Sequence, residues 1–318
     1  MFLIEPELTA VICFANEGDE VERTVRGIRD TCGDAVDILL INDASDDDRD
    51  YEAVADRHGA RYLENSERIG PAHSRHKGLR WAKTDNVIFL DAHMRFYAQN
   101  WHQVINDTIS CDPEALYCTR SKPLKPGGDW SGAPTGLGAS IVMDNQTFGG
   151  WLKPDWNIRA LGDGPTAYIP CVLGGCYAVR RQFMLHTEGY RGLHRYGGEE
   201  SLISIKAWLA GGSCQLINDV EIGHIYRGGK PAPWRDTVKY FHFNKLATAR
   251  IVMTEPEFAA AMELVETVEN AKAVKDVFRS RQGFVDQARL GFKKVQQRPL
   301  RYFLDLNEAF RSREKIEP

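Results

Sequence analysis

The chain has 318 residues, of which 43% are hydrophobic, so it is long enough to bury a substantial core. Its 44 acidic and 40 basic residues leave a formal net charge of −4, which excludes the strongly basic balance of proteins that bind nucleic acid or membranes over their whole surface. The seven cysteines form no CxxC pair, which argues against a disulfide framework and against a zinc cluster. No stretch approaches about eighteen uninterrupted apolar residues, and the N-terminus lacks the pattern of a signal peptide. The sequence therefore predicts a cytoplasmic protein without a transmembrane segment.

Short apolar runs alternate with helical patterns in the first part of the chain. Strands are expected at residues 8–14, 36–41 and 87–90, with a weaker strand at 60–65, and a helical pattern at about 21–29 follows the first strand. This alternation is typical of βαβ units. It predicts an α/β fold with a mostly parallel central sheet flanked by helices.

The second part of the chain has a different character. Residues 121–164 are rich in Gly, Pro and Trp, which predicts long loops, and a helix is expected from about 199 to 209. The pattern becomes almost wholly helical from residue 236 onwards. We therefore expect one α/β domain over residues 1–235 and a C-terminal helical extension over 236–318, packed on or beside it.

Polar side chains follow the strongest strands at the points where these strands end. Asn16 and Glu17 follow the first strand, Asp43 follows the second, and Asp91 and His93 follow the fourth. The carboxyl ends of strands line the ligand crevice of open α/β sheets, so these residues are expected around one crevice.

The pair Asp91 and His93 suits a divalent cation. Side chains at i and i+2 of an extended chain point to the same face, and a carboxylate with an imidazole favours Mn²⁺ ahead of Mg²⁺. His224 follows an alternating apolar segment and can supply a third ligand from a neighbouring strand. The alternatives are an Asp that merely closes a strand beside a surface His, and a packed or exposed His224.

Four further residues have patterns that suit a bound nucleotide. Asp43 is placed to accept hydrogen bonds from a base or ribose, and Arg75 lies in a basic cluster near a helix start that suits phosphate. The alternatives are a solvated acidic turn and ordinary surface charge. Gly174 and Gly175 interrupt an apolar segment, which favours a close approach of backbone or ligand.

Two adjacent carboxylates, Glu199 and Glu200, begin the helix that follows two glycines. An acid at a helix N-terminus can serve only to complement the helix dipole. Alternatively, the loop presents a general base or a sugar-binding acid to the crevice.

Several motifs occur together in an order that resembles a known family. FLDAH, PDWN, PCVLGGCYAV, YGGEE, AWLAGG and GHIYR recur in the same order and at similar spacing in the catalytic domains of polypeptide N-acetylgalactosaminyltransferases. More broadly, residues 8–230 look like family 2 glycosyltransferases of the GT-A fold. Several motifs in one order are far more specific than any one of them.

This resemblance implies a metal-dependent transferase that uses a UDP-sugar donor. By the resemblance, Asp91, His93 and His224 bind Mn²⁺, with Mg²⁺ as the second choice, and the cation holds the donor diphosphate. Asp43 would lie at the uracil and ribose. The donor-binding set that the resemblance implies is Asp43, Arg75, Asp91, Gly174 and Gly175.

The resemblance also implies catalytic roles for Glu199 and Glu200. Glu199 would face the donor sugar. Glu200 stands where the animal enzymes usually have Asn, and Asn42 replaces the first Asp of the family's DDAS segment. Glu200 is the best candidate for the base that deprotonates the acceptor if the anomeric configuration inverts; if it is retained, the diphosphate itself can take that proton.

The acceptor stays open among peptide, glycan, lipid-linked sugar and modified nucleic acid. The alternatives to a transferase are a sugar nucleotidyltransferase and a non-catalytic module that binds nucleotide-sugar or glycan. The segment 227–234 (RGGKPAPW) suits a loop that closes over bound donor. Seven basic residues and one acid lie between Arg279 and Arg301, which predicts either a face for a polyanionic acceptor or an ordinary solvated helix face.

Overall fold

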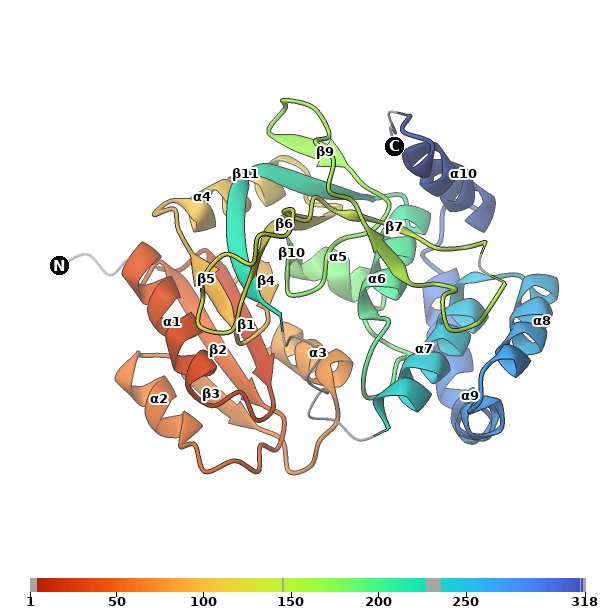
Figure 1. Cartoon of the computed structure of the whole chain (residues 1–318), viewed down its shortest axis with the longest axis horizontal. Coiled ribbons are helices and arrows are strands. Elements are labelled where there is room, and N and C mark those ends of the chain that lie inside the picture. The colour runs from red at the N-terminus through yellow and green to blue at the C-terminus, as the bar shows by residue number, and fades with distance from the viewer. Residues whose placement is uncertain (1–4, 145, 227–235, 315, 317–318) are drawn as a thin grey trace.

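The computed structural model describes residues 5–144, 146–226, 236–314 and 316 (Figure 1). The predicted closing loop at 227–234 lies outside these residues. Across the part of the chain that is described, no helix combines the length and the apolarity that a bilayer crossing requires. All seven cysteines are free, and four of them are buried.

The N-terminal half of the sheet is parallel, as the alternating pattern predicts. Strands pair in the order β3-β2-β1-β4, and their bounds are β1 Leu8–Phe14, β2 Val36–Asn42, β3 Arg61–Glu64 and β4 Asn86–Leu90. The connecting helices are α1 Asp19–Cys32, α2 Tyr51–Arg57 and α3 Pro71–Trp81. Because parallel strands end at the same edge, the loops after β1, β2 and β4 lie together.

Beyond β4 the sheet becomes mixed. Strand β10 (Cys176–Arg180) is antiparallel to both β4 and β6 (Ala115–Leu124). Strand β11 (Ser213–Ile225) runs parallel to β6 and antiparallel to β5 (Met94–Phe96) and β9 (Thr166–Tyr168). The pair β7 (Ala139–Ile141) and β8 (Pro154–Trp156) forms a separate small sheet within the Gly-, Pro- and Trp-rich region.

Helices cover both faces of the sheet because the buried strands are apolar on both sides. Ala10 and Ile12 of β1 point toward a cluster that includes α1 and α4 (Trp101–Cys111). Val11, between them, points toward α3 and α6 (Glu199–Leu209) on the other face. The alternation of β1 side chains thus joins both layers of the core.

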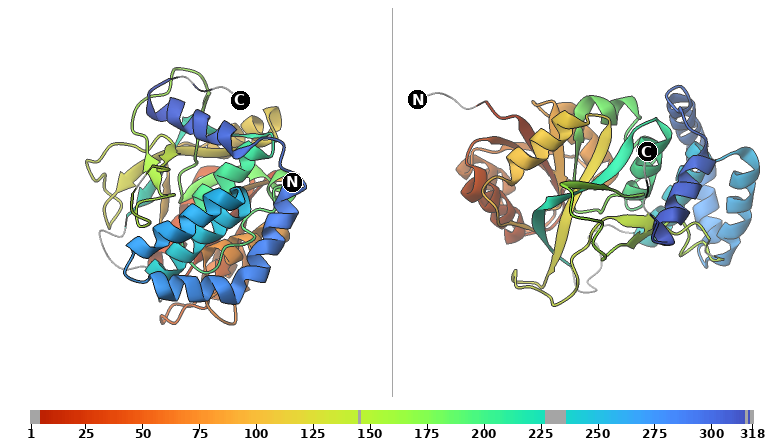
Figure 2. Two further views of the ribbon diagram at one scale, coloured as in Figure 1. Left: turned by 90° about the vertical axis from the view of Figure 1, so that its right-hand side faces the viewer. Right: turned by 90° about the horizontal axis from the view of Figure 1, so that it is seen from above.

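Four helices make up most of the chain after residue 236: α7 Thr237–Val252, α8 Glu255–Leu264, α9 Ala271–Lys293 and α10 Leu300–Arg311. Figures 1 and 2 place α8, α9 and α10 at the end of the molecule remote from α1 and α2. Phe243, Phe292 and Phe303 join these helices to the apolar cluster that contains α6. The division into domains at residue 235 stays a prediction.

The C-terminal end of α6 is held by the segment that follows α9. The backbone N–H groups of Gln297 and Arg298 both donate to the carbonyl of Leu209, at 2.8 and 2.9 Å. The guanidinium of Arg298 donates to the carbonyls of Trp208 and Gly212, at 3.2 and 2.9 Å. The carbonyls at the end of α6 are thereby satisfied by a part of the chain distant in sequence.

Candidate active site

A cavity of about 460 Å³ lies at the carboxyl end of β4. Its lining contains all but one of the predicted site residues: Arg75, Asp91, His93, Gly174, Gly175, Glu199, Glu200 and His224. These residues come from α3, the end of β4, the loop before β10, the start of α6, and β11. The fold thus brings together residues that are up to 149 positions apart in sequence, between Arg75 and His224.

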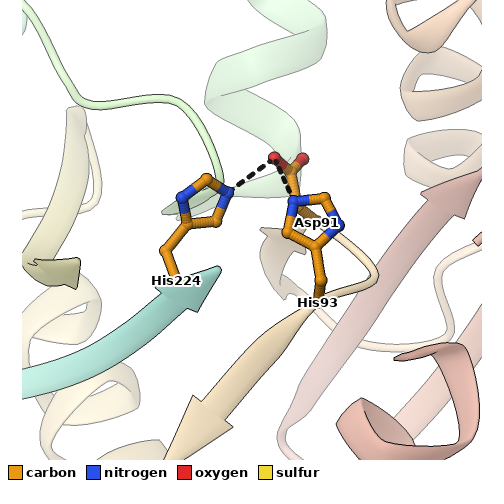
Figure 3. A group of neighbouring side chains, drawn as sticks. All are labelled: Asp91, His93 and His224. Carbon is orange, nitrogen blue, oxygen red and sulfur yellow. Dashed lines mark hydrogen bonds and ion pairs between the residues drawn. The ribbon is translucent and has the colours of Figure 1, made fainter. Parts of the chain in front are cut away.

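Asp91, His93 and His224 converge in a geometry that suits a cation (Figure 3). One ligand atom from each lies within 4.8 Å of the others. The pairing of β5 with β11 sets His224 opposite Met94, and so brings it beside His93. A carboxylate oxygen with two imidazole nitrogens on the wall of a cavity is a donor set that fits Mn²⁺.

Gly175 makes room for this cluster. Its φ is +73°, and a Cβ there would lie 3.1 Å from Cδ2 of His224 and 3.6 Å from Oδ2 of Asp91. The carbonyl of Gly175 accepts a hydrogen bond from the N–H of Asp91 at 2.8 Å. A side chain at this position would both strain the backbone and crowd the cluster.

Asp91 is held as an anion by its neighbours. Its Oδ2 lies 3.2 Å from Nε2 of His224, and its Oδ1 accepts a hydrogen bond from Nη2 of Arg75 at 2.8 Å. Burial by itself would raise the pKa of Asp91, but the hydrogen bond from His224 and the charge of Arg75 together hold it well below its usual range. Asp91 is therefore ionised at neutral pH on the part of the cavity wall where a cation would bind.

Glu199 and Glu200 lie at the start of α6, inside the same cavity. Burial and the charge of Glu200 raise the pKa of Glu199 to about 7, although Arg75 lowers it in part. Burial likewise raises the pKa of Glu200. Carboxyl groups whose pKa values are raised toward neutral pH suit general acid or base chemistry there.

Gly174 gives Glu200 its room. A Cβ at Gly174 would collide with Oε1 of Glu200. The two glycines that the sequence marks as a place of close approach are therefore approached by protein side chains: Glu200 at Gly174, and His224 at Gly175.

Asp43 is the one predicted site residue outside the cavity lining. It is 1% exposed, and its carboxylate accepts hydrogen bonds from the N–H groups of Ile69 and Gly70, the amide of Asn65 and the hydroxyl of Ser74. Here Asp43 fixes the turn that leads into α3, which carries Arg75. Contact between Asp43 and a nucleotide stays a prediction.

Glu17 also lines the cavity, as the strand-end pattern predicts, and four aromatic residues do so without any role assigned from the sequence: Trp156, Tyr196, Tyr226 and Phe241. The rings of Trp156 and Tyr226 meet edge to face, with centroids 5.6 Å apart. Tyr226 follows His224 by two positions, so the alternation of an extended chain was a usable signal for it.

The sequence of the chain is similar to those of known glycosyltransferases. Residues 9–154 match the family model for glycosyl transferase family 2. The chain is 27% identical over 243 residues to probable N-acetylgalactosaminyltransferase 9 of Caenorhabditis elegans, covering 71% of this chain and 41% of the relative. It is 28% identical over 235 residues to human polypeptide N-acetylgalactosaminyltransferase 15, covering 70% of this chain and 36% of that protein. The chain thus spans less than half the length of these relatives.

A solved structure shares the fold. The structure described as GalNAc-T7 with UDP, GalNAc and Mn²⁺ superposes with a TM-score of 0.72 at 20% sequence identity, over 98% of this chain and 59% of that chain. The prediction of a GT-A fold is confirmed by this likeness, with the difference that the sheet is mixed rather than parallel beyond β4. The resemblance drawn from the motifs is confirmed as well.

Proposed function

We propose that this protein is a metal-dependent glycosyltransferase with a UDP-sugar donor. Its residues 9–154 match the model of glycosyl transferase family 2. The observation that supports this most is that one cavity contains both a candidate cation-binding triad (Asp91, His93 and His224) and a pair of carboxylates (Glu199 and Glu200). The relatives named for N-acetylgalactosamine transfer make an N-acetylhexosamine donor the first to test.

The triad would hold the cation that neutralises the negative charge of the departing diphosphate, and Arg75 would orient the triad. Asp91, His93 and His224 would hold Mn²⁺, which when bound supplies positive charge to the leaving group. Arg75 fixes the direction of the Asp91 carboxylate through its 2.8 Å hydrogen bond. Gly174 and Gly175 border the space where the sugar would lie. Such preorganised charge stabilises the transition state.

Glu199 and Glu200 are proposed to act on the acceptor and the donor sugar. Glu199 is 3% exposed and accepts a hydrogen bond from the N–H of Gly197 at 3.2 Å, so its carboxylate is fixed in place. Glu200 is the proposed base: burial raises its pKa, which makes it a stronger base toward an acceptor hydroxyl than an exposed carboxylate. A general base on the protein corresponds to an inverting reaction.

The basic segment between Arg279 and Arg301 gives little support for a polyanionic acceptor. Two of the basic residues between Arg279 and Arg301 serve the fold, because Arg289 donates to the carbonyls of Arg250 and Met253 while Arg298 donates to the end of α6. Arg301 pairs with Asp305 at 2.6 Å. These contacts favour a solvated, internally paired face over a polyanion site, so we do not assign the acceptor to this segment.

The decisive experiment is donor turnover. Purified protein with Mn²⁺ should release UDP from one member of a panel of nucleotide-sugars, and Asp91→Asn and His224→Ala should each reduce that release at least 100-fold with an unchanged circular dichroism spectrum. Asp48→Asn, at an exposed position on the neighbouring loop, is the matched control and should retain full activity.

Other outcomes would replace the proposal. Consumption of a sugar phosphate and a nucleoside triphosphate would indicate a nucleotidyltransferase, and donor binding without turnover would indicate a binding module. The cytoplasmic location remains a prediction, to be tested by imaging the tagged protein in its own cell.

A further inference from the structure

Glu17 contacts the ring of His93 on the side that faces away from the other two members of the triad. Its Oε2 lies 3.1 Å from Nδ1 of His93, while Nε2 of the same ring lies 3.9 Å from Oδ2 of Asp91. The side chains of Glu17 and His93 are 12% and 10% exposed. One ring nitrogen thus meets a shielded carboxylate, and the other points into the triad.

A neutral imidazole carries its proton on one nitrogen only, and the hydrogen bond of one nitrogen decides the state of the other. A carboxylate at Nδ1 favours the tautomer with hydrogen on Nδ1, which leaves the lone pair of Nε2 free to bind a cation. We propose that Glu17 is a positioning residue for His93: it fixes the ring orientation and the tautomer in which Nε2 can ligate the metal. This inference rests on the cation site of the proposed function.

The backbone holds Glu17 in place for this role. Asn16, immediately before it, adopts a left-handed conformation with φ 55°. Its amide Nδ2 donates to Oδ1 of Asp46 at 2.6 Å, its Oδ1 accepts from the N–H of Asp46 at 2.8 Å, and its own N–H donates to Oγ of Ser45 at 3.0 Å. The loop after β1 is therefore tied to the loop after β2. Strained backbone that surrounding contacts hold in this way is typical of functional sites.

His224 differs from His93 in this respect. Its Nε2 faces Oδ2 of Asp91 at 3.2 Å, but its Nδ1 is buried and has no hydrogen-bond partner among the described residues. The described part of the protein therefore builds an acceptor behind His93 and not behind His224. Loss of Glu17 should consequently change the tautomer of His93 and leave that of His224 unchanged.

The first test is the binding of Mn²⁺ alone, without nucleotide, by calorimetry. Glu17→Ala should weaken Mn²⁺ binding about 10- to 100-fold, the range typical for loss of such a partner. Glu17→Gln should lose less, because the amide oxygen still accepts a hydrogen bond from Nδ1–H. Asp19→Asn, a neutralised acid two residues further on with a side chain that is 62% exposed, is the control and should bind Mn²⁺ as the wild type does.

The second test is the tautomer itself, read by ¹⁵N NMR of the metal-free protein, with the His93 signal identified from a His93→Asn variant. Wild type should show hydrogen on Nδ1 of His93, Glu17→Ala should lose this preference, and the His224 signal should keep its tautomer in both. The central result, the tautomer of His93 in the wild type, needs no variant of Glu17, so it remains decisive even if Glu17→Ala does not fold.

Where the wild type binds Mn²⁺, any of three results would overturn the inference. These are an unchanged Mn²⁺ dissociation constant in Glu17→Ala, hydrogen on Nε2 of His93 in the wild type, and weakened binding with an unchanged His93 tautomer, which would make Glu17 a direct ligand. Neither readout depends on sugar transfer. If Mn²⁺ binding and tautomer respond as expected while no nucleotide-sugar is consumed, the role of Glu17 stands and the proposed function falls. A wild-type protein that binds no Mn²⁺ removes the metal site and this inference with it.

Discussion

Gly174 shows how one missing side chain sets the geometry of the cavity. Its φ is not in the left-handed region, so alanine is acceptable to the backbone, yet a Cβ would collide with Oε1 of Glu200. Glu200 would have to rotate away from its position in the cavity. A substitution at Gly174 should therefore affect the rate of catalysis much more than the stability of the fold.

We expect Gly174→Ala to reduce the rate of donor turnover about 10- to 100-fold, because displacing a catalytic group by about 1 Å has effects of this size. The melting temperature should fall by only a few degrees. Steady-state kinetics and thermal unfolding check both. Gly283→Ala, in the open middle of α9, is the control: it should leave turnover unchanged and stabilise the protein by about 0.5–1 kcal/mol. Full activity in Gly174→Ala would argue that catalysis does not require the Glu200 side chain at its position in the cavity.

At the scale of a single side chain, the sequence best predicted positions that depend on a fixed spacing along a strand. Asp91 and His93 share a face because they are two positions apart, and the structure places them together. Asp43 shows the limit, because a carboxylate at a strand end accepts equally well from a ribose or from the N–H groups of Ile69 and Gly70. Which donor it meets depends on a turn whose path no local pattern specifies.

Among the elements, α6 begins in the cavity and carries a fully buried lysine further along. Lys206 is 0% exposed, its Nζ donates to the carbonyl of Gly189 at 2.9 Å, and it lies 5.5 Å from the centroid of the Phe292 ring. Burial lowers the pKa of Lys206 from 10.5 to about 7. A neutral amine inside α6 is therefore the favoured form in the folded protein above that pH.

This lowered pKa makes stability depend on pH in a known direction. Between about pH 7 and 10 the unfolded chain keeps a proton on Lys206 that the folded chain has released, so the free energy of unfolding rises with pH across this window. The slope from one such group is at most about 1.4 kcal/mol per pH unit. Lys206→Met should therefore reduce the rise of stability between pH 7 and 9, measured by urea unfolding.

Lys294→Met, at an exposed position near the end of α9, is the control and should leave the slope as in the wild type. An identical slope in wild type and Lys206→Met would show that the lysine stays charged in the folded state. Any constant offset from the lost hydrogen bond to Gly189 is separate from the slope.

The element boundaries were predicted more closely than the way the elements pair. The strand at 8–14 and the helix at 199–209 coincide with β1 and α6, because apolar periodicity is local information. The insertion of β10 between β4 and β6 in antiparallel direction is a property of the assembled sheet. Nor does helical periodicity place a lysine in the core, since the groups around Lys206, Phe292 of α9 and the carbonyl of Gly189, come from other parts of the chain.

At the scale of the whole molecule, α10 is bound to the small β7–β8 sheet by polar contacts as well as apolar ones. Asn307 of α10 is 2% exposed, and its amide makes two hydrogen bonds to Ile141 of β7: Oδ1 accepts from the N–H and Nδ2 donates to the carbonyl, both at 2.8 Å. The side chain satisfies both backbone groups of Ile141, as a neighbouring strand would.

Asn307→Leu should cost about 2 to 4 kcal/mol of stability, because it leaves two buried backbone groups without partners. Denaturant unfolding followed by tryptophan fluorescence and by circular dichroism should still give one coincident transition, since α6, α7, α9 and α10 share one apolar cluster. Glu308→Gln, at the exposed neighbouring position, is the control, with a change within about 0.5 kcal/mol. Two separated transitions in the wild type would instead support independent domains on either side of residue 235.

The contacts that hold the C-terminal end of α6 affect how this protein can evolve. The carboxylates of the cavity stand at its first turn, and Gln297 and Arg298 hold its last carbonyls. A substitution at position 298 removes contacts from the same helix that presents Glu199 and Glu200, so we expect the fitness effects of the two regions to be coupled. Epistasis is therefore expected between positions almost a hundred residues apart, and a variant that is neutral at Arg298 in one background can be deleterious in another with an altered Glu200.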